Sequence, residues 1–176
     1  MRTKITVLMA LVLSLFFTGC KEKEEAVVVE EVNEEKVDLI HDEFPEAKAE
    51  VAAFMVELKE TIMAKDVEKL ISYHAYGPKF TEFQGGKPRN GSTENEETER
   101  GIFGSVTEVQ AFDFDDLKIA VYDNVANVTF HSNFQLQFGE DVVVVNDQIT
   151  LLLVRTDDGW KFVHEHHSPL AKEEAS

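Results

Sequence analysis

The sequence has few of the residues that would cross-link it or give it a positive surface. It contains one cysteine, Cys20, among 176 residues. An intramolecular disulfide is therefore excluded, and the fold must be stable without one. Lysine and arginine number 17 against 34 aspartates and glutamates, which gives a net charge of −17. A surface of this charge repels nucleic acids and anionic lipid headgroups, so we expect no nucleic-acid partner.

The sequence also lacks a glycine-rich phosphate loop, an internal repeat and a comfortable membrane span. Its N-terminal apolar run, Ile5–Phe17, follows the positive residues Arg2 and Lys4. A run of this length is typical of the core of a signal peptide and is short for a transmembrane helix. The sequence therefore predicts export of the chain.

The end of this run, Phe17-Thr18-Gly19-Cys20, resembles the lipobox of bacterial lipoproteins. The resemblance implies that residues 1–19 are removed as a lipoprotein signal peptide and that Cys20 receives lipid. Two or more acyl chains would give a stable membrane anchor. The implied location is the bacterial cell envelope, either periplasmic or on the cell surface. The alternative is an ordinary secretory signal that happens to end in cysteine.

Residues 20–44 are rich in glutamate and aspartate and contain no glycine. Repulsion between like charges favours an extended chain, so we predict an acidic tether here. The remaining length suits one domain with a single core. We expect this domain over residues 45–170 and a short tail over residues 171–176.

Helical patterns occupy the first half of the domain. Pro45 suits the first turn of a helix, where a missing N–H is tolerated. That helix would bury one apolar stripe, made of Val51, Phe54, Met55, Leu58 and Ile62. Asp66 is placed to cap a second helix over residues 67–74. Thr93 and Glu96 form a capping-box pattern for a third helix over residues 94–103, and residues 79–92 between them read as a loop.

From Val106 onward the apolar residues alternate with polar ones. Turn residues divide this region into predicted strands at 106–114, 117–122, 125–138, 142–155 and 160–168. The segment 125–138 alternates most regularly. Helices followed by an antiparallel meander predict an α+β fold, with the helices on one face of a curved antiparallel sheet.

Two segments, residues 64–75 and 154–168, resemble the nuclear transport factor 2-like superfamily, in particular its SnoaL-like branch. The second segment also resembles the association domain of calcium/calmodulin-dependent kinase II. The resemblance implies a cone in which a curved sheet wraps around the N-terminal helices and leaves a cavity at its open end. Members include isomerases, cyclases, hydrolases, binding proteins and oligomerisation modules, so the fold does not assign a reaction.

The last predicted strand carries the candidate site. Strict alternation would place Trp160, Phe162, His164 and His166 on one face and Glu165 with His167 on the other. His164 and His166 would then lie about 7 Å apart, and imidazoles exchange protons near neutral pH. We take His164, His166 and His131 as candidate catalytic residues. The full set of candidate pocket residues is Tyr73, His74, Phe83, His131, Arg155, Trp160, Phe162, His164 and His166.

Several readings of these residues remain open. The histidines could simply pack in a half-buried sheet. His164 and His166 would suit a metal such as Zn²⁺ if His131 supplied a third ligand, but we expect no metal and no cofactor.

The favoured function is binding of a small, partly apolar molecule in the cone. The alternatives are an isomerase, cyclase or hydrolase with a histidine base, and an oligomerisation or protein-interaction module. The resemblance implies a homodimer.

Overall fold

The computed structural model describes residues 36–87 and 91–171, and the folded unit begins at Val37. The predicted signal peptide, Cys20 and most of the predicted tether and tail lie outside these residues. The elements follow the order α1 (Pro45–Met63), α2 (Val67–Ser72), β1 (Thr81–Gln84), α3 (Ser92–Ser105), β2 (Glu108–Tyr122), β3 (Val125–Phe138), β4 (Asp141–Val145), β5 (Asp147–Thr156) and β6 (Gly159–Pro169). Among the described helices, none is long and apolar enough to cross a membrane.

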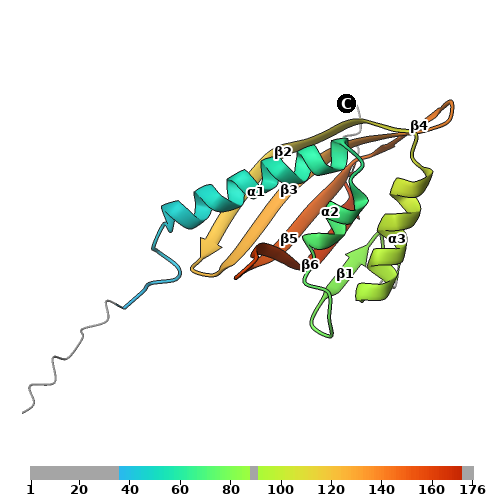
Figure 1. Ribbon diagram of the computed structural model, residues 1–176. Coiled ribbons are helices and arrows are strands. Elements are labelled where there is room, and N and C mark those ends of the chain that lie inside the picture. Colours follow the sequence, from blue (N-terminus) through green and yellow to red (C-terminus); the bar gives the residue numbers. More distant parts are fainter. Residues whose placement is uncertain (1–35, 88–90, 172–176) are drawn as a thin grey trace, which may run out of the picture. The chain divides into compact units, whose positions relative to one another are not determined.

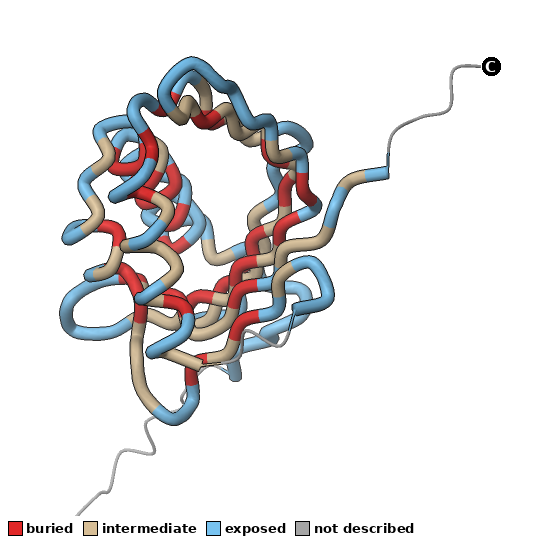
Figure 2. The backbone as a smooth tube through the Cα atoms, turned by 90° about the vertical axis from the view of Figure 1, so that its right-hand side faces the viewer, coloured by how far each residue is buried: buried red, intermediate tan, exposed pale blue. Residues whose placement is uncertain are grey.

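The predicted α+β fold class is confirmed. The sheet has the strand order β1-β6-β5-β3-β2, and β4 pairs with β3. All pairs are antiparallel except β1 with β6, which is parallel. Helix α1 runs along one face of the sheet, and α2 and α3 lie near β1 and β6 (Figure 1). Buried residues gather on the sides of the helices and strands that face one another (Figure 2).

Helix α1 forms as its sequence predicts. It begins at Pro45, and the whole apolar stripe of Val51, Phe54, Met55, Leu58 and Ile62 is buried. These side chains pack with strand residues such as Val128 and Leu153, both fully buried, in a single core. Full burial of one such side chain stabilises a fold by about 1.5–3 kcal/mol, so this stripe fixes α1 against the sheet.

Three details of the secondary structure differ from prediction. Helix α3 begins at Ser92 after Gly91 and has no side-chain cap, so the predicted capping box at Thr93 is wrong. The two strands expected at 106–114 and 117–122 form one strand, β2, with a register irregularity between Asp115 and Lys118. The strand expected at 142–155 divides at Asn146 into β4 and β5.

Strand β1 is the difference that matters most for the site. Residues 79–92 read as a loop in sequence, yet Thr81–Gln84 pairs in parallel with β6. A four-residue strand has too short a pattern to be recognised by alternation. It forms because β6 offers an open edge, and it brings Glu82 directly beside Glu165.

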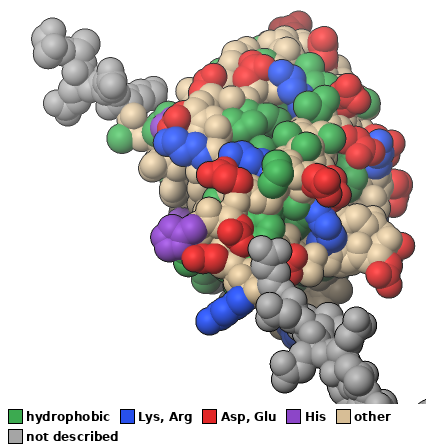
Figure 3. Space-filling model, turned by 90° about the vertical axis from the view of Figure 1, so that its left-hand side faces the viewer, with side chains coloured by type: hydrophobic (Ala, Val, Ile, Leu, Met, Phe, Trp, Pro, Cys, Tyr) green, Lys and Arg blue, Asp and Glu red, His purple; other side chains and the backbone are tan. Residues whose placement is uncertain are grey.

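Charged side chains are dispersed over one face of the domain (Figure 3). Acidic side chains are spread between basic and hydrophobic ones on the face shown in Figure 3, with no single acidic patch. Three acidic residues, Glu82, Asp147 and Glu165, are instead buried inside the domain.

Candidate functional site

Strand β6 does not keep the alternation that its sequence predicts. Leu153 of β5 pairs with Phe162, whereas the preceding residue, Leu152, pairs with His164. Val163 is therefore an extra residue in β6, a β-bulge, and the two faces of the strand exchange beyond it. Glu165 is buried and His166 is exposed, so the predicted sharing of one face by Phe162, His164 and His166 is wrong.

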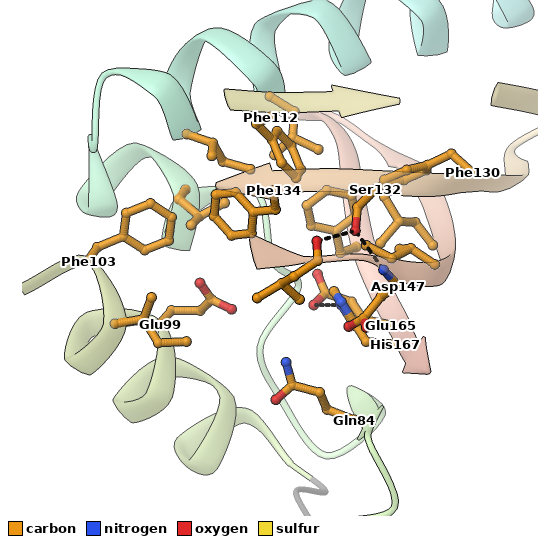
Figure 4. Close-up of a pocket in the computed structure, with 18 of the residues that line it drawn as sticks. Gln84, Glu99, Phe103, Phe112, Phe130, Ser132, Phe134, Asp147, Glu165 and His167 are labelled. Atoms are coloured by element: carbon orange, nitrogen blue, oxygen red, sulfur yellow. Dashed lines mark hydrogen bonds and ion pairs between the residues drawn. The ribbon is translucent and has the colours of Figure 1, made fainter. Parts of the chain in front are cut away.

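A cavity of about 130 Å³ lies between the helices and the sheet. Its wall is mostly apolar and includes four phenylalanines from α3, β2 and β3, which are Phe103, Phe112, Phe130 and Phe134. Polar groups converge on it from several elements, as Figure 4 shows for Gln84, Glu99, Ser132, Glu165 and His167. The cavity therefore has a broad aromatic part and a polar wall to which α3 and the strands β1, β3, β5 and β6 contribute.

Glu165 forms a buried ion pair with His74. The Nε2 atom of His74 lies 2.9 Å from Oε1 of Glu165, and the two side chains are 2% and 7% exposed. The Nδ1 atom of His74 lies 3.0 Å from the carbonyl oxygen of Leu70. Because both neighbours are hydrogen-bond acceptors, both ring nitrogens must donate, and His74 is an imidazolium.

The pKa values of this pair shift in the directions that the geometry requires. Burial opposes the charge of His74, but the adjacent Glu165 carboxylate outweighs it and raises the pKa of His74 above its usual range. Burial likewise opposes the charge of Glu165, yet His74 and His167 together hold the pKa of Glu165 well below its usual range. Glu165 is therefore ionised throughout the neutral range.

His167 lies on the other side of the same carboxylate. Its Nε2 atom is 3.6 Å from Oε2 of Glu165, a contact of opposite charges that is too long for a hydrogen bond. This nitrogen is buried and has no hydrogen-bond partner within the described part of the chain. Burial disfavours the charged ring, but Glu165 outweighs this effect and raises the pKa of His167. His167 is thus positioned to contact an occupant of the cavity.

Glu82 adds a second buried carboxylate. It is 0% exposed and lies opposite Glu165 across the β1–β6 pair. The side-chain amide of Asn95 donates a 2.8 Å hydrogen bond to Oε2 of Glu82, and the hydroxyl of Tyr76 donates to the amide oxygen of Asn95. The Tyr76 ring stacks on His74 at 4.9 Å between centroids. Asn95, Tyr76 and His74 thus form a continuous series of contacts from the carboxylate of Glu82 to that of Glu165.

Only two of the predicted pocket residues, His74 and Phe162, line this cavity. Tyr73 and Trp160 instead border a second, more open hollow next to α1. The indole N–H of Trp160 donates to Glu50 at 3.0 Å, and Arg155 lies 2.7 Å from the same carboxylate. Arg155 therefore contacts a surface carboxylate and does not line the cavity.

The remaining predicted residues lie on the outer side of the sheet. Phe83 is 51% exposed and packs edge-on against His164 and His166. His164 shares a 2.8 Å hydrogen bond with Thr81. His131 lies on β3 between the inward residues Phe130 and Ser132 and does not line the cavity.

The functional residues that sequence reasoning missed are Glu82, Asn95, Glu99, Glu165 and His167. Glu82 and Asn95 fell in segments without a strand pattern or an apolar helical stripe. Glu165 and His167 were recognised in the correct strand but assigned to the wrong face. No local signal in the sequence marks the bulge at Val163.

Comparison with known proteins agrees with this architecture. Residues 51–172 match the profile of the SnoaL-like domain. This chain belongs to the SnoaL-like family. The predicted relationship to the nuclear transport factor 2-like superfamily is therefore confirmed, and the match covers every residue that lines the cavity. A comparison with curated protein sequences found no significant match.

Solved structures with the same fold include several classes of protein. A candidate dehydratase of the nuclear transport factor 2-like family from Streptomyces avermitilis has a TM-score of 0.64 and 23% identity, over 73% of this chain and 99% of its own. A superfamily member from Salmonella enterica has a TM-score of 0.64 and 17% identity, over 74% and 95%. The kinase II hub homology domain from Chlamydomonas reinhardtii has a TM-score of 0.54 and 23% identity, over 71% and 98%. At these identities the likeness extends to the fold alone.

Proposed function

We propose that this SnoaL-like domain binds a small molecule that has an apolar body and one polar group. The observation that carries the proposal is a cavity with aromatic walls and, on one side, the buried ion pair His74–Glu165 with His167 beside it. Ligand sites typically combine a largely apolar lining with a few convergent polar groups. The phenylalanines would hold the apolar body, and His167 would contact the polar group.

The volume of the cavity limits the size of the ligand. The cavity measures about 130 Å³, whereas an apolar protein cavity of about 150 Å³ accommodates benzene. Drug-sized ligands need about 300–1,000 Å³. The proposed ligand therefore resembles a single ring with one polar substituent, unless the aromatic walls move apart on binding.

Binding can be tested with the purified full chain in the presence of EDTA. Native mass spectrometry would detect a molecule that survives purification, and NMR titration with single-ring compounds would measure affinity. Ile102 lines the cavity from α3, so Ile102→Phe should fill it and weaken binding at least tenfold. Ile119→Phe is the matched control, because Ile119 packs against the core without lining the cavity. Equal binding to all three proteins would contradict the proposal.

We also propose that Cys20 anchors the domain to a membrane of the bacterial cell envelope. The segment Phe17-Thr18-Gly19-Cys20 and its apolar leader support this anchor. Mass spectrometry of the N-terminal peptide would show diacylglyceryl-cysteine at Cys20. A Cys20→Ser variant should leave the membrane fraction, and a mature chain with an unmodified cysteine would contradict the anchor.

Self-association is a second candidate function, favoured by an apolar surface on β4. Val142, Val143 and Val144 are each about half exposed, and exposed apolar strands at a sheet edge favour pairing with another chain. The likeness to a kinase II hub homology domain also supports this candidate. Light scattering should show a dimer in the wild type and a monomer in Val143→Lys. A wild-type monomer at micromolar concentration would exclude it.

A further inference from the structure

Two carboxylates lie side by side inside the domain where like charges should repel. Glu82 and Glu165 are register partners on the parallel strands β1 and β6, and they are 0% and 5% exposed. Like charges directly opposite each other destabilise a sheet, and buried charges require pairing or metal coordination. Cations are stabilised in this part of the interior, as the imidazolium of His74 beside Glu165 shows.

His167 completes a set of donor atoms around this place. One ligand atom each from Glu82, Glu165 and His167 lies within 4.8 Å of the other two. Carboxylate oxygens and imidazole nitrogens are the ligands of Zn²⁺, at about 2.0–2.2 Å. In the tetrahedral geometry that Zn²⁺ prefers, two such ligand atoms are about 3.4 Å apart, so the three side chains would have to move towards one another to close the set around an ion.

The surrounding side chains hold these donors as second-layer residues do in metal sites. His74 contacts Oε1 of Glu165 at 2.9 Å and is itself fixed by the carbonyl of Leu70. Asn95 donates to Oε2 of Glu82 at 2.8 Å and receives a hydrogen bond from Tyr76. Hydrogen bonds of this kind orient metal ligands and raise metal affinity.

The buried Nε2 atom of His167 gives an independent reason. It has no hydrogen-bond partner in the described residues, although buried polar atoms nearly always have one. A neutral imidazole would direct the lone pair of this nitrogen at an ion. An organic ammonium group has N–H donors and needs hydrogen-bond acceptors. A carboxylate is a better acceptor for it than the His167 ring, which accepts a hydrogen bond only when it is neutral.

We propose that Glu82, Glu165 and His167 form a binding site for a divalent first-row transition ion, with Zn²⁺ as its probe. This site differs from the His164–His166 metal site considered from the sequence, because those two histidines lie on the outer side of β6. Binding of the ion would displace a proton from His167 when that ring is protonated. Glu165 and His167 also line the cavity, so the cavity borders the site.

The test uses the full chain, freed of metal with EDTA and then dialysed. Isothermal titration calorimetry with ZnCl₂ should show one ion per chain. His167→Ala and Glu82→Gln should each weaken binding more than tenfold, and Asn95→Ala about tenfold, as loss of a second-layer partner does. His164→Ala/His166→Ala is the matched control, because it removes two neighbouring imidazoles from the same strand and should leave the affinity unchanged.

X-ray absorption on the zinc-loaded wild type gives a readout that depends on no variant folding. Coordination by nitrogen and oxygen with one imidazole is expected, whereas a sulfur ligand at about 2.3 Å would indicate Cys20. Four results would overturn the proposal: a sulfur ligand, no stoichiometric binding, binding unchanged in folded His167→Ala and Glu82→Gln, or binding lost in the control. The tests of organic ligands above contain EDTA, so either proposal can fail without the other.

Discussion

Nε2 of His74 lies 2.9 Å from Oε1 of Glu165, and both side chains are more than nine-tenths buried. The pair joins the segment that follows α2 to β6 at the polar wall of the cavity. Desolvation makes such pairs weak contributors relative to apolar packing, but removal of one partner leaves an uncompensated charge in the interior. The pair therefore specifies the arrangement of the wall more than it adds net stability.

Single substitutions in this pair should destabilise the fold strongly. His74→Ala and Glu165→Ala should each lower the free energy of unfolding by about 3–5 kcal/mol, the usual range for breaking a buried pair. Urea unfolding followed by circular dichroism would measure this. His166→Ala is the control, since its exposed side chain should contribute less than about 0.5 kcal/mol. Similar losses in all three variants would show that the pair is not the cause.

The pair should also give the metal-free protein a defined stability maximum on the pH scale. The pKa of His74 is raised above its usual 6.5, so its contribution is complete below about 6.5 and is lost as pH rises through the folded pKa. The pKa of Glu165 is lowered from its usual 4.5, so its contribution is complete above about 4.5 and is lost as pH falls. Both act together between these limits.

Thermal unfolding in EDTA across pH 3–9 would test this maximum. We expect the highest Tm between about pH 4.5 and 6.5 and a flatter profile in Glu165→Gln, which removes the charge that raises the pKa of His74. Lys59→Met removes an exposed partner of Asp113 and serves as the control. A wild-type profile identical to that of Glu165→Gln would contradict the expectation.

The bulge at Val163 predicts that adjacent histidines differ in chemical reactivity. His166 is exposed, whereas the Nε2 atom of His167 is buried. Diethyl pyrocarbonate should therefore modify His166 at least tenfold faster than His167 in the folded protein, and the two rates should converge in urea. Peptide mass spectrometry would measure both sites. Faster modification of His167 would mean that β6 has no bulge.

The hydrogen bond between Trp160 and Glu50 of α1 should contribute little to the free energy of unfolding, because it lies at the surface. Glu50 receives the indole N–H and lies 2.7 Å from Arg155, but Glu50 is 52% exposed. Glu50→Ala should therefore lower stability by only about 0.5–1 kcal/mol, and it should shift the fluorescence of Trp160. Glu46→Ala, on an exposed position of the same helix, should change neither. A loss comparable to that of His74→Ala would contradict this reading.

Local patterns were sufficient where an element buries one regular face. The stripe of α1 was read correctly because helical spacing and burial coincide at every position from Val51 to Ile62. The first half of β3 alternates because each inward residue from Ala126 to Ser132 meets the core. The SnoaL-like membership was also predicted from the sequence, because residues 64–75 and 154–168 resemble that family.

The sequence by itself determined the helices, the strands of the meander and the strand that carries the candidate site. Tertiary structure decided which residues of that strand face the cavity. One extra residue, Val163, exchanges the two faces of β6, and its cause lies in pairing with β5. The opposite edge of β6 pairs with Thr81–Gln84, which forms β1, and this pairing sets Glu82 against Glu165. Strand pairing is a long-range interaction, so a window of local residues does not contain it.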